Sequence, residues 1–156
     1  MVDINKLIYW LNRTCKSLDD RFDINRGGCC YVAYVIAKLL DKYQVKDYYL
    51  GLISYQEKYI EALEYNTRFN IKKDFPNSLM IKEGTCNHYF IILNNKRING
   101  CMYYWGNKKV HNIKLSIKPK DILWVYRNGT WCDDYDKKYN LIIYNELENI
   151  FKKCKN

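Results

Sequence analysis

The sequence predicts an α+β fold, in which a central buried helix packs on an antiparallel sheet and flanking helices lie at both ends of the chain. Three observations predict it. A strongly apolar helical pattern begins at Cys29, a strand and its hairpin partner surround Asn94-Asn95, and apolar residues recur at helical spacing near both termini. The 156 residues match the size of one domain, 1–156, with enough chain to bury a core.

The first predicted helix runs from Asp3 to Leu18, with Asp3 as its N-cap. Its apolar residues recur every three or four positions, which is typical of a helix with one buried face. They are Ile4, Leu7, Ile8, Leu11 and Leu18. A polar loop from Asp19 to Gly28 then leads into the central helix, which we predict over 29–43.

The sheet is predicted from short aromatic and β-branched runs that turn signals separate. The clearest strand is His88 to Leu93, which a tight connection at Asn94-Asn95-Lys96 joins to a returning strand. Further strands are predicted at 48–55, 79–81, 97–104 and 110–117. Further helices are predicted at 56–65, from Pro119 onward, and at 139–153.

The positive net charge of the chain is a weak indication of function. Lysine and arginine number 26 against 17 acidic residues, a formal charge of +9. The chain is also rich in Asn, Ile and Tyr, and this combination indicates an A/T-biased coding sequence that raises lysine without selection for charge. We therefore do not expect nucleic acid as a partner, although a basic balance permits it.

Seven cysteines, an odd number, argue against a disulfide framework. The first residues lack the apolar stretch of a signal peptide, and no apolar run has the length of a membrane span. We expect reduced thiols, no membrane partner and a cytoplasmic location, which includes the cytoplasm of a phage-infected host cell.

Cys29 stands where reactive cysteines are commonly placed. Gly27 and Gly28 precede it, and a buried helix follows at once. A cysteine at a helix N-terminus lies among unpaired N–H groups and the positive end of the helix dipole, and both favour the thiolate. We expect the glycines to leave an open approach to the sulfur. The alternative interpretation is a buried helix that carries cysteine as a small core residue.

A nucleophilic cysteine needs a base, and only two histidines are present. His88 begins the best strand, whereas His111 is expected in a lysine-rich turn. A catalytic histidine also needs a third group that accepts its other ring proton. Asn99 lies across the predicted hairpin, and we expect its amide to orient His88. The other candidates for this role are Asn87 and Asp121.

This order of residues resembles the papain-like superfamily of thiol hydrolases, including its transglutaminase-like and cell-wall amidase branches. The family's Gly-x-Cys-aromatic form is matched by Gly28-Cys29-Cys30-Tyr31 and makes Cys30 the nucleophile. Its other form, Gly-Cys with alanine four residues after the cysteine, is matched by Gly28, Cys29 and Ala33, and we favour Cys29.

The resemblance implies a papain-like fold with a Cys-His-Asn triad of Cys29, His88 and Asn99, and with Cys30 as the alternative nucleophile. It implies a cysteine-dependent hydrolase or acyl transferase, of the thiol-protease or amidase type, that acts on an amide, isopeptide or thioester bond of a peptide or protein substrate. The alternative is a catalytically inactive papain-like fold that serves a phage or mobile element as a binding or structural protein.

A structural zinc site is the competing explanation of the cysteines. Its ligands would come from Cys29, Cys30, Cys86, His88 and Cys101. These residues contain no Cys-x-x-Cys pair, and adjacent cysteines on a helix point in different directions. We therefore expect neither a metal nor an organic cofactor.

Overall fold

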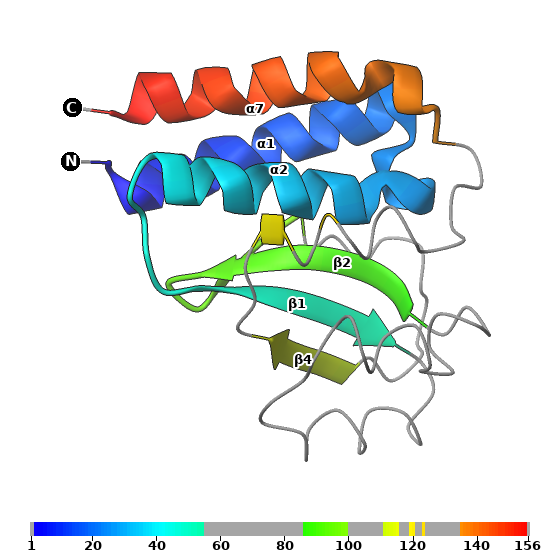
Figure 1. Cartoon of the computed structure of the whole chain (residues 1–156), viewed down its shortest axis with the longest axis horizontal. Coiled ribbons are helices and arrows are strands. Elements are labelled where there is room, and N and C mark those ends of the chain that lie inside the picture. The colour runs from blue at the N-terminus through cyan, green and yellow to red at the C-terminus, as the bar shows by residue number, and fades with distance from the viewer. Residues whose placement is uncertain are drawn as a thin grey trace.

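The computed structural model describes residues 2–54, 86–99, 111–115, 119–120, 123 and 135–155. Within them, three long helices lie on one face of an antiparallel sheet, which confirms the α+β class (Figure 1). The helices are α1 (Ile4–Phe22), α2 (Cys29–Lys42) and α7 (Asn140–Cys154). The strands are β1 (Tyr48–Ser54), β2 (Cys86–Leu93), β3 (Lys96–Ile98) and β4 (His111–Leu115).

Helix α1 begins as the sequence predicts and ends one turn later. The Asp3 Oδ1 atom accepts a hydrogen bond from the Lys6 N–H at 3.0 Å and so caps the helix. The predicted loop from Asp19 is wrong as far as Phe22, because no glycine or proline interrupts the helix there. The chain leaves α1 at Asp23, which has a left-handed φ of 50°.

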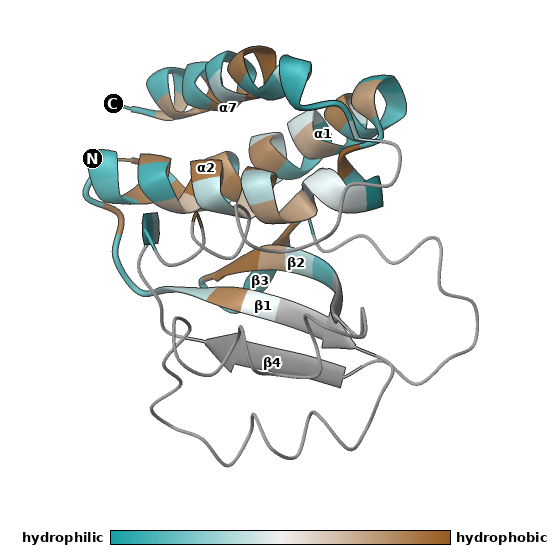
Figure 2. Cartoon of the chain, turned by 45° about the vertical axis from the view of Figure 1, so that its right-hand side comes forward, coloured by the Kyte–Doolittle hydropathy of each residue, from teal (hydrophilic) through white to brown (hydrophobic). Residues whose placement is uncertain are grey.

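Helix α2 is the central buried helix that the sequence predicts. Nine of its 14 residues are buried, and it packs against β2 on one side and α7 on the other. Gly27, in the short π-helical segment η1 (Ile24–Gly28), has φ 108° and makes the turn into the helix. Figure 2 shows hydrophobic and hydrophilic residues alternating along α1, α2 and α7, as in amphipathic helices, and buried apolar residues of all three belong to one core cluster.

The strand order is β3-β2-β1-β4, and all neighbours are antiparallel. The turn at Asn94 and Asn95 has φ values of 50° and 57°, which suit a two-residue hairpin. Strand β3 is shorter than predicted, because the chain turns away at Asn99 with φ 60°. His111 lies at the start of β4 and pairs with Ser54 of β1, so its expected place in a turn is wrong.

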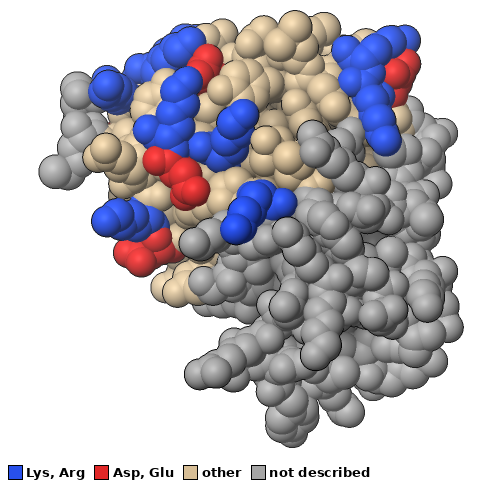
Figure 3. Space-filling view, in the orientation of Figure 1, with Lys and Arg blue, Asp and Glu red and all other residues tan. Residues whose placement is uncertain are grey.

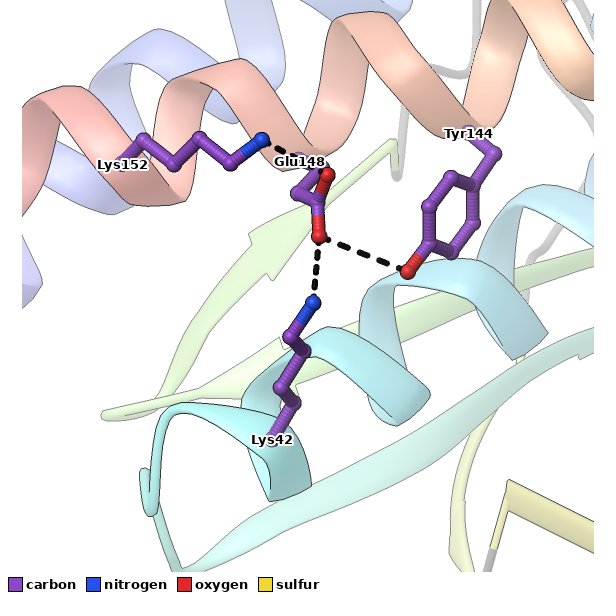
Figure 4. Close-up of polar contacts among 4 residues, drawn as sticks. All are labelled: Lys42, Tyr144, Glu148 and Lys152. Carbon is purple, nitrogen blue, oxygen red and sulfur yellow. Dashed lines mark hydrogen bonds and ion pairs between the residues drawn. The ribbon is translucent and has the colours of Figure 1, made fainter.

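A partly exposed edge of the α2–α7 contact contains an acidic residue with three partners (Figure 4). The Glu148 carboxylate accepts hydrogen bonds from Lys42 Nζ of α2 at 2.5 Å, from Lys152 Nζ at 2.9 Å and from the Tyr144 hydroxyl at 3.5 Å. The bonds from Lys42 and Lys152 hold the pKa of Glu148 well below its ordinary value, at about 2. The cluster therefore links the two helices most strongly when Glu148 is ionised.

The surface of the described residues mixes both charges. Figure 3 shows Asp and Glu side chains beside most groups of Lys and Arg on the visible face. Such mixing is typical of a solvated protein surface, whereas nucleic-acid sites concentrate one sign of charge. Among the described helices, none is long and apolar enough to cross a membrane.

Two predicted elements, the helix at 56–65 and the strand at 79–81, lie outside the described residues. So do Asp121 and Cys101. The prediction of one domain stays a prediction.

Candidate active site

Cys29 lies against the edge of strand β2. Its Sγ atom accepts a hydrogen bond from the main-chain N–H of Tyr89, at 3.5 Å. The two residues are 60 positions apart, so the contact joins the start of α2 to the start of the best-predicted strand. Tyr89 is the residue directly after His88.

The contact lies close to the described end of strand β3. Leu93 and Lys96 close a two-residue hairpin, and Leu93, Ile91 and Tyr89 therefore direct their main-chain groups toward β3. Among the described residues, the last pair of the β2–β3 ladder joins Ile91 to Ile98. Two residues before Ile91, the Tyr89 N–H donates to the Cys29 sulfur.

His88 is buried, with 2% of its surface exposed, and its imidazole Nε2 is hydrogen-bonded to the main-chain oxygen of Asn99. A carbonyl oxygen only accepts hydrogen bonds, so Nε2 carries the proton. The neutral ring then has an unprotonated Nδ1, the atom that is able to act as a base. Contact with Asn99 thus fixes one tautomer of His88.

This contact corrects the expected role of the Asn99 side chain. We predicted that the side-chain amide orients the imidazole, but the main-chain carbonyl does so. Asn99 has a left-handed φ of 60°, which turns its carbonyl toward β2. Its amide Nδ2 is buried and has no hydrogen-bond partner among the described residues.

The imidazole and helix α2 belong to opposite faces of β2. Side chains alternate along a strand, and Ile91 and Leu93 belong to the core shared with the helices, whereas Phe90 and Ile92 form a separate cluster. His88 lies on the Phe90 face, where the two rings are stacked with centroids 6.1 Å apart.

Cys29 and His88 nevertheless both make hydrogen bonds near one edge of the strand. The sulfur contacts the N–H next to His88, so it lies within about 6 Å of the His88 Cα atom. The imidazole extends toward Asn99, which follows β3 on that same edge. Within the described residues, the thiol and the imidazole are not hydrogen-bonded to each other.

The protonation state of Cys29 differs from the sequence-based expectation. The pKa of the Cys29 thiol is raised to about 11, chiefly by burial and to a smaller extent by the negative charge of Asp19. The N–H groups of Tyr89, Cys30 and Cys29 lower this pKa, but by less than burial raises it. The expected thiolate is therefore wrong for this conformation, in which Cys29 is a neutral thiol.

His88 is also neutral. Burial lowers the pKa of the imidazole below its ordinary value of 6.5, while the bond to Asn99 and the charge of Asp19 oppose the shift. A neutral thiol and a neutral imidazole are together able to give a thiolate and an imidazolium by one proton transfer.

The structure separates the two candidate nucleophiles. Cys30 belongs to the large core cluster beneath α1 and α7, whereas Cys29 contacts β2 at the end of the ladder. Both residues are 6% exposed. The contact with Tyr89 makes Cys29 the better candidate.

Gly28 has a different role from the one that we predicted. A Cβ atom at this position would lie 2.7 Å from two ring carbons of Tyr135, so the ring fills the space that the glycine provides. The Tyr135 N–H also donates to the Arg26 carbonyl at 3.3 Å. The glycine therefore allows Tyr135 to pack against the start of α2 and does not leave an open approach.

Asn12 and Asp19 are two polar residues near the site that the sequence analysis did not identify. Asn12 Oδ1 accepts from the Asn99 N–H at 3.0 Å, and Asp19 Oδ1 accepts from the Asn25 N–H at 2.8 Å. Asn12 follows Ile8 and Leu11 within the apolar stripe of α1. A polar side chain inside such a stripe was a signal in the sequence.

The remaining candidates are partly outside the described residues. Asn87 lies in β2, and Asp121 and Cys101 are not described. Among the described residues, no three His, Cys, Asp or Glu side chains lie close enough together to hold a metal ion.

Comparison with known proteins returns no family model, no curated protein and no solved structure that matches this chain.

Proposed function

We propose that this protein is a cysteine-dependent hydrolase or acyl transferase with Cys29 as nucleophile, His88 as base and Asn99 as the group that orients the base. One observation carries the proposal: Cys29 Sγ binds the N–H beside His88, at the edge where Asn99 fixes the imidazole tautomer. The papain-like resemblance of the motif order points the same way and belongs to the same proposal.

Each residue has a defined task in this proposal. His88 Nδ1 accepts the Cys29 thiol proton, directly or through one water molecule. The sulfur then attacks a substrate carbonyl carbon, and the resulting oxyanion is stabilised by main-chain N–H groups at the start of α2. The imidazolium returns its proton to the leaving amine or thiol as the bond to the carbonyl breaks.

The product of this step is a thioester between Cys29 and the acyl group. Water then attacks the thioester to give a carboxylic acid and the free thiol, or an amine attacks it to give a new amide. The Asp19 charge favours the imidazolium that forms during attack, since it raises the pKa of His88. The substrate bond is an amide, isopeptide or thioester.

A second candidate function rests on the burial of Cys29. A thiol that is 6% exposed and has a pKa of about 11 is a poor nucleophile in this conformation. These values favour the alternative of an inactive papain-like fold that binds a partner, as a phage or mobile-element protein does. The two functions differ in whether Cys29 accepts an acyl group.

Acylation by p-nitrophenyl acetate separates them. Release of nitrophenol gives the rate, and mass spectrometry of the intact and digested protein gives the modified residue. We expect one acetyl group on Cys29 in the wild type and in the matched control Cys30→Ser, and none on the Cys29→Ser variant. His88→Gln should slow the reaction by about 10²- to 10⁴-fold.

Equal acylation of Cys29 and Cys30, or an unchanged rate in His88→Gln, would contradict the enzymatic proposal. Absence of acylation in the folded wild type would favour the binding function. Circular dichroism of every variant establishes that each is folded.

A further inference from the structure

Asn12 connects helix α1 to the turn that holds Asn99. Its Nδ2 donates to the Arg97 carbonyl at 2.9 Å and to the Ile8 carbonyl at 3.2 Å. Its Oδ1 accepts from the Asn99 N–H at 3.0 Å. The carboxamide therefore binds two main-chain groups that lie two residues apart along the end of β3.

These two groups are on the outer edge of the sheet. Strand β3 is last in the order β3-β2-β1-β4, so its outer groups have no strand to pair with among the described residues. A carboxamide has the same donor and acceptor as a peptide group. The Asn12 side chain on α1 thus makes the two hydrogen bonds to the edge strand that a peptide group of a neighbouring strand would make.

The second of these bonds is at the residue that turns out of the ladder. Asn99 has φ 60°, and a residue other than glycine in this region needs support from its surroundings. Its N–H donates a hydrogen bond to Asn12 Oδ1, and its carbonyl accepts one from His88 Nε2. Both main-chain polar groups of Asn99 are therefore hydrogen-bonded to side chains. Loss of the hydrogen bond between the Asn99 N–H and Asn12 frees the Asn99 carbonyl to rotate away from the imidazole.

We propose that Asn12 is a positioning residue of the His88 site, which holds the Asn99 turn so that its carbonyl keeps the proton of His88 on Nε2. Asn12 does not touch a reacting atom. It acts through Asn99, and it leaves Nδ1 as the basic nitrogen. The role of Asn12 in catalysis rests on the proposed function. Its effect on the His88 tautomer does not, since the tautomer is a property of the resting protein.

Nitrogen-15 NMR of protein labelled in histidine tests the proposal. The chain has two histidines, so a His111→Gln spectrum assigns the signals of His88. At pH 8 the wild type should show the Nε2–H form. In Asn12→Leu, which has a side chain of similar volume but no polar atoms, the fraction of the Nδ1–H form should rise about fivefold, the effect of one net hydrogen bond.

The matched control is Asn5→Leu. Asn5 is also on α1 and also contacts the hairpin, through Lys96 Nζ at 3.3 Å, but it does not contact Asn99. This variant should keep the wild-type tautomer. Asn12→Asp keeps the acceptor for the Asn99 N–H and should lie closer to wild type than Asn12→Leu. If Asn12→Leu does not fold, Asn12→Ala replaces it.

An unchanged tautomer in folded Asn12→Leu or Asn12→Ala would overturn the proposal, and so would an equal shift in Asn5→Leu. Equal shifts in Asn12→Asp and Asn12→Leu would overturn it as well, since the Asn99 N–H would then not be the decisive contact. Acylation of Cys29 in the same variants keeps the two proposals apart. A shifted tautomer without any acylation in the wild type supports the positioning role and contradicts the enzyme.

Discussion

Cys29 should react with a disulfide reagent as a buried neutral thiol, so that its rate rises tenfold per pH unit up to about pH 11. The perturbation is pH itself, because thiol–disulfide exchange proceeds through the thiolate. The comparison is the same cysteine in the urea-unfolded chain, whose pKa is close to the ordinary value.

The size of the effect follows from the pKa of about 11, compared with an ordinary value of 9.0. At pH 8 this difference lowers the thiolate fraction roughly 100-fold, since each pKa unit is a factor of ten. A more basic thiolate is also a better nucleophile, which offsets roughly a factor of ten. Ionisation alone therefore makes folded Cys29 about tenfold slower, and an exposure of 6% slows it further.

The assay is release of the nitrothiobenzoate anion from dithionitrobenzoate, with mass spectrometry to assign each modified cysteine. Cys30→Ser is used throughout, so that the adjacent thiol does not contribute. A rate that stays level between pH 6 and pH 9 would refute the reasoning, because it would mean that Cys29 is already a thiolate. A folded rate equal to the unfolded rate would refute it too.

Two further predictions concern the packing around the site and the helices above it. Gly28→Ala should lower the free energy of unfolding by about 1–3 kcal/mol, because its Cβ would lie 2.7 Å from the Tyr135 ring. The same change in a Tyr135→Ala background should cost much less, and equal costs in urea denaturation would contradict this explanation. Glu148→Gln should lower stability at neutral pH and flatten its decline in acid. A carboxyl whose pKa is about 2 in the folded state stabilises the fold above its unfolded value near 4.5 and loses this effect as pH falls toward 2. Thermal denaturation between pH 2 and pH 7 measures it, and parallel wild-type and variant profiles would contradict it.

The sequence by itself determined the helices and the hairpin, because their signals are local. Apolar spacing defines α1 and α2, Asp3 is a local cap, and Asn94-Asn95 specifies the two-residue turn whatever lies around it. It also determined which residues are candidates, since only two histidines exist and Cys29 begins a buried helix. The predicted hairpin also indicated that His88 and Asn99 lie close together.

The tertiary structure alone decided which atoms meet and in what protonation state. Asn12 of α1 accepts a hydrogen bond from Asn99 at the end of β3 although the two residues are 87 positions apart, and Cys29 accepts one from Tyr89 across 60 positions. The pKa of Cys29 is set by the burial that α2 and β2 create together, which outweighs the local effect of the helix N-terminus. Desolvation sums over every neighbour in space, and a spacing pattern along the chain does not contain that sum.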